Sequence, residues 1–317
     1  MAKFKTIGLV GRPSHAGVLD SLRRLLAILA ERKLAVVLDA DTARLLKTTN
    51  FQVFNRDELS RHCDVVMVVG GDGTMLNVAK SIASGKIPVI GINRGRLGFL
   101  TDILPEELET RVDELLSGAF AVESRFLLDA SLRQAGKEFH GKESNGKGSA
   151  KAAKKKAVDQ PLGSALNDVV LHPGKAAQMI EFELFIDGKF VYSQESDGLI
   201  VATPTGSTAY ALSAGGPIMH PGLNAVVLVP MYPHSLSSRP LVVDGDSEIR
   251  IVVAAKGRLH PQLSCDGEVV CTVNAGDEII VAKKSVPLQL LHPSEHSFYQ
   301  ACRSKLGWGN RLVRVDD

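Results

Sequence analysis

The sequence contains few aromatic residues, few cysteines and no long apolar run. Aromatic side chains make up 5% of the 317 residues, and there are 4 Cys and 1 Trp. No stretch reaches the ~18 consecutive apolar residues that a membrane-spanning helix needs, and the start of the chain lacks a signal-peptide pattern. These absences argue against membrane and secreted proteins, and we expect a cytoplasmic protein.

The cysteines and histidines lack the spacing of a metal site. Cys63, Cys265, Cys271 and Cys302 form no C-x-x-C pair, and none of the 9 histidines lies in an H-E-x-x-H pattern. We therefore expect reduced thiols, no disulfide framework and no dedicated metal ligands from the protein.

Neither sign of charge dominates the sequence. Lys and Arg number 37 against 35 Asp and Glu, which gives a net charge of +2. Nothing in this balance indicates nucleic acid or a membrane as a partner, and a small molecule is expected. A Lys-rich stretch over residues 141–163 is the exception. Because no aromatic residue interrupts it, we favour a solvated loop over a nucleic-acid patch.

The most informative segment is Val65–Leu76, with the sequence VVMVVGGDGTML. Its apolar, mostly β-branched start predicts an interior strand of a parallel sheet. Gly70, Gly71 and Gly73 would permit positive φ and close approach of the backbone to a ligand. Thr74 begins a helical pattern, so an anion is expected at the N-terminus of this helix.

Asp72, at the centre of this turn, has two interpretations. It can accept a proton from a hydroxyl that attacks phosphate, or bind a metal ion. It can also simply cap the helix, since Asp is a favoured cap residue. The segment is not a Walker A loop, because the Lys-Ser/Thr pair is missing. Taken alone, it leaves both interpretations open.

The length and the change of hydrophobic period predict two domains. The first part alternates strands and helices, which predicts a parallel sheet wrapped by helices. The expected strands cover residues 6–10, 35–39, 65–69 and 88–92, and the expected helices cover 19–32, a segment from 74, and 108–116.

From residue 126 the period changes to two, which predicts half-buried antiparallel strands. These strands are expected at 128–132, 180–186, 248–252 and 278–281, with hairpin turns at Asp187-Gly188 and Asp266-Gly267. A last helix is expected over 297–306. We predict a Rossmann-like α/β domain over residues 1–123, a β-sandwich-like domain over 124–290, and a tail over 291–317 that is able to pack on the first domain.

Polar groups inside the second part form two further signals. Thr203–Tyr210 combines a proline, a glycine and small hydroxyl side chains, which predicts a turn and a short helix that offer N–H and O–H donors to phosphate or sugar oxygens. Asn167-Asp168 lies within an apolar strand, and Ser196-Asp197-Gly198 precedes another. Paired amide and carboxylate groups suit recognition of a ribose or a base. Helix caps and edge residues remain alternatives for each.

In order and spacing these segments together resemble bacterial NAD kinases, the ATP-NAD kinase family. The resemblance rests on Gly70–Thr74, Asn93–Thr101, Asn167-Asp168, Ser196–Gly198, Thr203–Tyr210, His172–Lys175, Pro230–His234 and Lys305–Trp308. It implies ATP-dependent phosphorylation of the adenosine ribose 2′-hydroxyl of NAD, with a divalent cation, Mg²⁺, carrying the ATP phosphates. It also implies a homo-oligomer, either a homodimer or a homotetramer.

Carried onto this chain, the resemblance makes Asp72 the proton acceptor and assigns the dinucleotide to residues of both domains. Asn167 and Asp168 would hold ribose and base groups, and Asp197 the other half of the dinucleotide. The residues expected to bind substrate are Gly71, Gly73, Asn167, Asp168, Gln178, Glu195, Asp197, Thr208, Ala209, Tyr210, Ala211, Leu212, Ser213 and Glu268. Glu195, Glu268 and Gln178 stand where relatives vary, which leaves the choice between NAD and NADH open. Arg94 and Arg96 are candidates for ATP.

Two other functions remain as alternatives. A diacylglycerol or sphingoid-base kinase shares the glycine-Asp-glycine-Thr turn but predicts an apolar entry groove. A non-catalytic sensor of NAD or NADP predicts binding without ADP formation. Asp266 is interpreted as a hairpin residue rather than a ligand.

Overall fold

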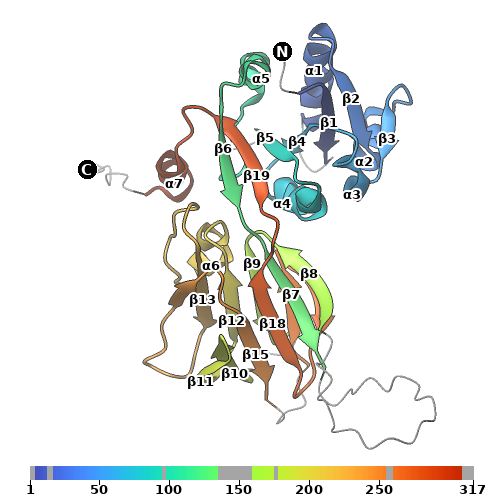
Figure 1. Ribbon diagram of the computed structural model, residues 1–317. Coiled ribbons are helices and arrows are strands. Elements are labelled where there is room, and N and C mark those ends of the chain that lie inside the picture. Colours follow the sequence, from blue (N-terminus) through green and yellow to red (C-terminus); the bar gives the residue numbers. More distant parts are fainter. Residues whose placement is uncertain are drawn as a thin grey trace, which may run out of the picture. The chain divides into compact units, whose positions relative to one another are not determined.

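The computed structural model divides into two compact units (Figure 1). It describes residues 4–12, 17–94, 98–134, 159–174, 178–254 and 260–308. Unit 1 comprises residues 1–126, 220–222 and 285–317, and unit 2 comprises residues 127–219 and 223–284. Among the described residues, no helix is both long and apolar enough to cross a membrane.

Unit 1 is built on a seven-stranded sheet with the order β3-β2-β1-β4-β5-β19-β6. All neighbouring pairs are parallel except β19 and β6, which pair antiparallel. The strands are β1 (Thr6–Gly11), β2 (Ala35–Asp39), β3 (Gln52–Phe54), β4 (Val65–Gly70), β5 (Pro88–Asn93), β6 (Phe120–Arg125) and β19 (Leu288–Pro293). The C-terminal part of the chain therefore returns to the first sheet.

Six helices belong to the described part of unit 1, and their ends follow local signals. The apolar face of α1 packs into the core, and α5 ends at Gly118, which adopts φ 88. Glycine adopts this left-handed conformation without strain. The helices are α1 (Val18–Glu31), α2 (Ala40–Leu46), α3 (Arg56–Leu59), α4 (Asp72–Ile82), α5 (Leu108–Ser117) and α7 (Phe298–Leu306).

The core of unit 1 explains the unbroken apolar run of β4. Every residue of β4 is buried, because helices cover both faces of a parallel sheet. Fully burying one such side chain contributes roughly 1.5–3 kcal/mol. The glycine turn follows directly after β4 and therefore lies at the carboxyl edge of the sheet, where ligands of open α/β sheets bind.

Unit 2 contains two six-stranded antiparallel sheets, with the orders β11-β10-β15-β18-β7-β8 and β14-β13-β12-β9-β16-β17. The first comprises β7 (Leu128–Arg133), β8 (Gln160–Ala165), β10 (Ile180–Ile186), β11 (Lys189–Ser196), β15 (Ile249–Val253) and β18 (Glu278–Lys283). The second comprises β9 (Asp168–His172), β12 (Gly198–Ala202), β13 (Ala225–Met231), β14 (Leu241–Asp244), β16 (Gln262–Cys265) and β17 (Glu268–Thr272). A four-residue helix, α6 (Tyr210–Ser213), follows a 3-10 turn at Gly206–Thr208.

Both predicted hairpins are present in unit 2. Asp187-Gly188 joins β10 to β11, and Asp266-Gly267 joins β16 to β17. All four residues have positive φ, as two-residue hairpin turns require.

The fold class is confirmed: a parallel α/β unit and an antiparallel β unit. The Lys-rich loop ends earlier than the expected residue 163, because Gln160 already pairs in β8. Residues 141–158 lie outside the described part of the chain. The boundary expected at residue 290 falls inside β19, because β19 hydrogen-bonds to β5 and β6 in the first sheet.

Candidate functional site

The glycine turn lies between β4 and α4, but its glycines act differently from the prediction. Gly71 has φ −103 and precedes α4 as its N-cap residue, and Gly73 lies inside the helix, so neither uses positive φ. A Cβ on Gly70 would come 2.5 Å from Oγ1 of Thr74, whereas a Cβ on Gly71 or Gly73 would meet no atom of the described residues within 4 Å. Glycine therefore serves close packing at position 70 and leaves the backbone accessible at 71 and 73.

Asp72 does not cap α4. Its carboxylate instead accepts three hydrogen bonds from the segment after β5. Oδ2 accepts from the N–H of Phe99 at 2.9 Å, and Oδ1 accepts from the N–H of Leu100 and the hydroxyl of Thr101, both at 3.1 Å. Gly98 approaches so closely that a Cβ there would lie 2.1 Å from Oδ1. We call residues 98–101 the acceptor turn.

The C-terminal segment contacts the same site. Nζ of Lys305, on α7, lies 3.7 Å from Oδ2 of Asp72, and both side chains are partly exposed. The ring of Phe99 packs against Phe298 with centroids 6.2 Å apart. The sequence pointed to the segments that carry Phe99 and Lys305, but it assigned neither residue a role.

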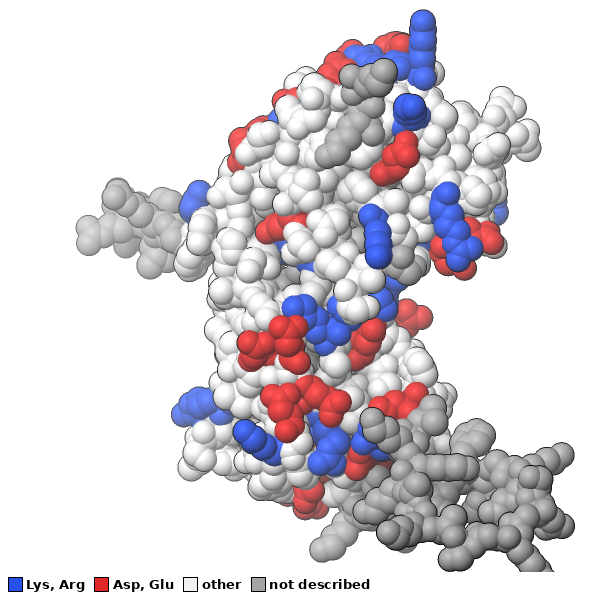
Figure 2. Space-filling view, viewed as in Figure 1, with Lys and Arg blue, Asp and Glu red and all other residues white. Residues whose placement is uncertain are grey.

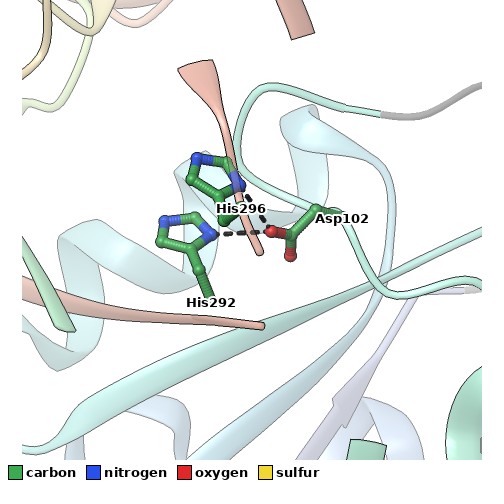
Figure 3. A group of neighbouring side chains, drawn as sticks. All are labelled: Asp102, His292 and His296. Carbon is green, nitrogen blue, oxygen red and sulfur yellow. Dashed lines mark hydrogen bonds and ion pairs between the residues drawn. The ribbon is translucent and has the colours of Figure 1, made fainter. Parts of the chain in front are cut away.

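Asp102, directly after the acceptor turn, meets two histidines from the C-terminal segment (Figure 3). Oδ2 of Asp102 lies 2.9 Å from Nδ1 of His292 and 2.8 Å from Nδ1 of His296. The two imidazole rings stack with centroids 3.9 Å apart. We call these three residues the histidine cluster. Sequence reasoning missed it, although His292 stands in a His-Pro pair near the end of the chain.

The histidine cluster is spaced for hydrogen bonds rather than for an ion. Its ligand-type atoms lie within 4.8 Å of one another, but both nitrogens face the same carboxylate oxygen at hydrogen-bond distance. A zinc ion needs ~2.0–2.2 Å to each ligand, so these side chains would have to separate to admit it.

In this cluster, hydrogen bonds and opposite charges outweigh the effect of burial on the pKa values of Asp102 and His292. Burial alone would raise the pKa of Asp102, but the hydrogen bonds of His292 and His296 outweigh it and lower that pKa to about 2. Burial alone would lower the pKa of His292, but Asp102 and Glu123 outweigh it and raise that pKa above its ordinary value. Nε2 of His292 lies 3.2 Å from Oε2 of Glu123, as an ion-pair contact.

In unit 2, Asp266 organises the predicted Asn167-Asp168 pair. Its carboxylate accepts the N–H groups of Leu166 at 2.9 Å, Asn167 at 2.8 Å and Asp168 at 3.2 Å. Asp266 is therefore a hairpin residue that also shapes the neighbouring strand. Asp168 is 5% exposed, and burial together with the charge of Asp266 raises its pKa to about 7.

The turn after β12 packs against the same strand. The N–H of Thr203 donates to the carbonyl of Asn167 at 2.9 Å, and the hydroxyl of Thr203 donates to the carbonyl of Leu166 at 2.5 Å. A Cβ on Gly206 would lie 2.1 Å from the Asn167 carbonyl oxygen. The structure therefore brings Asn167, Asp168 and this turn together.

Two hydroxyls of this turn donate hydrogen bonds inside it. Ser207 donates to the carbonyl of Pro204 at 2.6 Å, and Thr208 donates to that of Thr205 at 3.2 Å. The short α6 cannot act as an anion-binding helix end, because it has only four residues. Of the residues expected to line the pocket, Tyr210 is 50% exposed, whereas Ala211 is fully buried in an apolar cluster. Thr208, Ala209 and Leu212 are partly buried, and Ser213 is exposed.

Ser213 borders a hollow of about 260 Å³ that Met231, Tyr232, Ser238 and Arg239 also line. Asp197 lies beside this wall, since its N–H donates to the carbonyl of Met231 at 2.9 Å. The remaining expected residues, Gln178, Glu195 and Glu268, have exposed side chains, as does Asp197. The expected set therefore falls into one group in unit 1 and a larger group in unit 2.

The arginines proposed for ATP are only partly described. Arg94 lies against Gly17, the N-cap residue of α1, where an added Cβ would overlap the guanidinium. Arg96 lies outside the described residues. Positive and negative side chains lie interspersed on the face shown in Figure 2, in keeping with the small net charge.

Comparison with known proteins gives one consistent result. Residues 7–120 match the ATP-NAD kinase N-terminal domain, and residues 166–292 match the ATP-NAD kinase C-terminal domain. The NAD kinase of Azotobacter vinelandii is 55% identical over 312 residues, which are 98% of this chain and 99% of that protein. The NAD kinase of Pseudomonas putida is 53% identical over the full length of both chains.

Solved structures of related enzymes share the fold. A yeast NADH kinase complexed with NADH superposes with a TM-score of 0.83 at 25% identity, covering 98% of this chain and 90% of that one. An NAD kinase from Archaeoglobus fulgidus in complex with ATP has a TM-score of 0.66 at 25% identity, covering 95% and 97%. Both domain matches and the full-length relatives lead to the same conclusion: the chain belongs to the ATP-NAD kinase family.

Proposed function

We propose that this chain transfers the γ-phosphoryl group of ATP to the 2′-hydroxyl of the adenosine ribose of NAD, giving NADP and ADP. Family membership and the full-length similarity to NAD kinases support the activity. The observation that carries the chemistry is the Asp72 carboxylate, which is held in one orientation at the carboxyl edge of a parallel sheet.

The hydrogen bonds of Asp72 indicate which oxygen receives the proton. A carboxylate offers about four lone-pair sites. Oδ1 accepts two hydrogen bonds, whereas Oδ2 accepts one and has the Lys305 ammonium at 3.7 Å. Oδ2 is therefore the acceptor for the ribose hydroxyl. As the new O–P bond forms and the bond to the ADP oxygen breaks, the hydroxyl proton passes to Oδ2.

Unit 2 supplies the residues that hold the dinucleotide in this proposal. Asn167 and Asp168 bind ribose and base groups, Asp197 binds the other half, and the accessible residues of the segment Thr208–Ser213 line the pocket, while Ala211 packs behind them. The defined geometry of Asn167 and Asp168 supports this role, since Asp266 and Thr203 fix their backbone from both sides. Gln178, Glu195 and Glu268 tune the choice between NAD and NADH.

The divalent cation belongs to the substrate in this proposal. Donors from the protein already engage both oxygens of Asp72, so this carboxylate is a poor fit for direct coordination of Mg²⁺. The cation is carried by the ATP phosphates and neutralises their charge during transfer. The proposal also includes a homodimer or homotetramer, and a cytoplasmic location that agrees with the four free thiols.

The deciding experiment incubates the protein with Mg²⁺ and ATP, and with NAD, NADH, diacylglycerol or a sphingoid base in separate reactions. NADP or NADPH and an equal amount of ADP are expected only with the dinucleotides. A phosphorylated lipid would support the lipid-kinase alternative. Tight NAD binding without ADP would support the sensor alternative. Chelation of the cation should stop turnover, and added Mg²⁺ should restore it.

A further inference from the structure

The acceptor turn lies between Asp72 and the histidine cluster. Phe99, Leu100 and Thr101 direct their donors at Asp72, and the next residue, Asp102, directs its carboxylate at His292 and His296. A displacement of Asp102 is therefore also a displacement of the groups that orient Asp72.

The backbone around the turn is tied on both sides, which makes it stiff enough to pass on such a displacement. Nδ2 of Asn93 donates to the carbonyl of Thr101 at 3.1 Å, and the N–H of Asn93 donates to the carbonyl of Ile103 at 2.8 Å. The N–H of Gly98 donates to the carbonyl of Thr101 at 2.9 Å. Thr101 has no exposed surface.

We propose that Asp102 is a positioning residue for phosphoryl transfer, and that His292 and His296 hold it so that the acceptor turn keeps Asp72 in its reactive orientation. This inference rests on the proposed function. It adds three residues to that function, none of which needs to touch a substrate.

The chemistry of the cluster favours such a role over simple packing. His292 is 1% exposed and has one carboxylate at each ring nitrogen, Asp102 at Nδ1 and Glu123 at Nε2. A neutral imidazole would turn a lone pair toward one of these carboxylates, so the doubly protonated ring is favoured. Oδ1 of Asp102 is buried and has no hydrogen-bond partner among the described residues, so the hydrogen bonds of the two histidines to Oδ2 position this carboxylate.

The other charged side chains that the structure describes near the cluster form ion pairs. Arg125 on β6 pairs with Glu123 at 2.6 Å. Arg111 on α5 pairs with Glu107, Glu114 and Glu295. His296 and Asp102 border a cavity of about 320 Å³ beside Arg111 and Glu295, which gives this side of the cluster access to solvent.

The protonation of His292 makes the positioning of Asp102 depend on pH. The pKa of His292 is raised in the folded protein. The stabilisation that the protonated ring gives to the folded cluster is therefore complete below the unfolded pKa of about 6.5, and it is lost as pH rises through the folded pKa. Asp102 and Glu123, with pKa values of about 2, stay charged throughout this window. The wild-type kcat is therefore expected to decline on the alkaline side.

The test compares His292→Asn, His292→Ala and Asp102→Asn with wild type, measuring kcat, KM and the pH profile of NADP formation. The asparagine amide can replace Nδ1 as a donor to Asp102 but does not titrate. We expect His292→Asn to keep kcat within about threefold at pH 6 and to lose the alkaline decline, while His292→Ala and Asp102→Asn lose about tenfold in kcat through misplacement of Asp72. KM values should change by no more than about twofold, since no substrate contact is removed.

Glu295→Gln is the matched control. Glu295 lies next to His296 in the turn after β19 but pairs with Arg111 rather than with Asp102. The kcat of this variant should equal that of wild type. His296→Ala, which removes a donor to Asp102 at a partly exposed position, is the milder variant if substitutions at His292 prevent folding, and its kcat should fall in the same direction. If folded His292→Ala and Asp102→Asn keep wild-type kcat, or if the wild-type profile has no alkaline decline, the inference fails while the proposed function stands. Wild type that makes no NADP would sink the proposed function instead. A cobalt(II) ligand-field spectrum that disappears in His296→Ala would replace the inference with a metal site.

Discussion

The two units keep their principal carboxylates in opposite environments. In unit 1, Asp72 is partly exposed and accepts three hydrogen bonds, with a lysine ammonium nearby. In unit 2, Asp168 is almost completely buried and faces the charge of Asp266, so its pKa rises to about 7. Hydrogen-bond donors therefore orient the carboxylate of Asp72, whereas burial and the like charge of Asp266 keep Asp168 partly neutral.

This contrast separates chemistry from binding. Donors that already point at Asp72 cost no reorganisation when the substrate arrives, which is how preorganised sites lower a barrier. A buried carboxylate with a raised pKa is stabilised most when a ligand brings hydrogen-bond donors to it, so this free energy contributes to the affinity for the ligand. Substitutions at the two positions should therefore divide between kcat and KM.

The largest expected effect is that of Asp72→Asn on turnover. The amide keeps the size of the side chain but cannot take the hydroxyl proton, so kcat should fall by at least ~10²-fold, the usual scale of a lost general base. NAD affinity, measured by calorimetry, should stay within about threefold of wild type. Retention of full activity would remove Asp72 from the chemistry.

Gly98→Ala tests the same carboxylate without replacing it. The new Cβ would lie 2.1 Å from Oδ1 of Asp72, so either the turn or the carboxylate must shift. We expect kcat to fall about tenfold or more, because a misplacement of about 1 Å can cost up to ~10²-fold. Gly73→Ala is the control for backbone substitution nearby, since its Cβ would meet no described atom within 4 Å. Because Gly73 lies inside α4, where alanine is the better helix former, the melting temperature of Gly73→Ala should equal or exceed that of wild type. A loss of stability equal to that of Gly98→Ala would contradict the packing argument.

What the sequence could predict depends on how far apart the partners lie. Hydrophobic period identified β2 and β10 to the residue, since the pattern of each strand is local. The partners of Asp72 lie 27–29 residues away in the acceptor turn, and Asp102 meets His292 across 190 residues. No pattern within one element records such pairs. The glycines illustrate the same limit. Positive φ was expected in the turn around Asp72, but the glycine that matters for this carboxylate is Gly98, which packs closely against it from a segment distant in sequence.

Asp168→Asn should reveal the opposite character of unit 2. Since the folded pKa of Asp168 is raised to about 7, the folded state binds more protons than the unfolded state between about pH 4 and pH 7, and stability falls as pH rises through this range. The variant removes this penalty, so it should be more stable than wild type at pH 8 by a few kcal/mol, because each tenfold change in proton affinity corresponds to about 1.4 kcal/mol. The difference should vanish near pH 4.

The same variant should weaken NAD binding about tenfold at pH 8, the effect of one lost charge-assisted hydrogen bond. Thermal unfolding and calorimetric titration on the same samples check both effects. A variant that is less stable than wild type at pH 8 would show that Asp168 is not strained in the free protein.

The smallest effect is expected for Asp266→Asn, which sharpens the contrast by changing the environment of Asp168 rather than Asp168 itself. The amide keeps one acceptor oxygen, which can serve the N–H groups of Asn167 and Asp168, gives up the acceptor of the Leu166 N–H, and removes the negative charge. Because like charge is the second cause of the raised pKa of Asp168, after burial, that pKa should fall but stay above its ordinary value. In wild type, NAD binding that needs the charged carboxylate should strengthen as pH rises from 6 to 8. In Asp266→Asn this rise should move to lower pH, with KM at pH 8 changed by only about threefold, because burial, the larger cause, is untouched. A pH profile of the KM for NAD that is identical in both proteins would mean that Asp266 acts on the backbone alone.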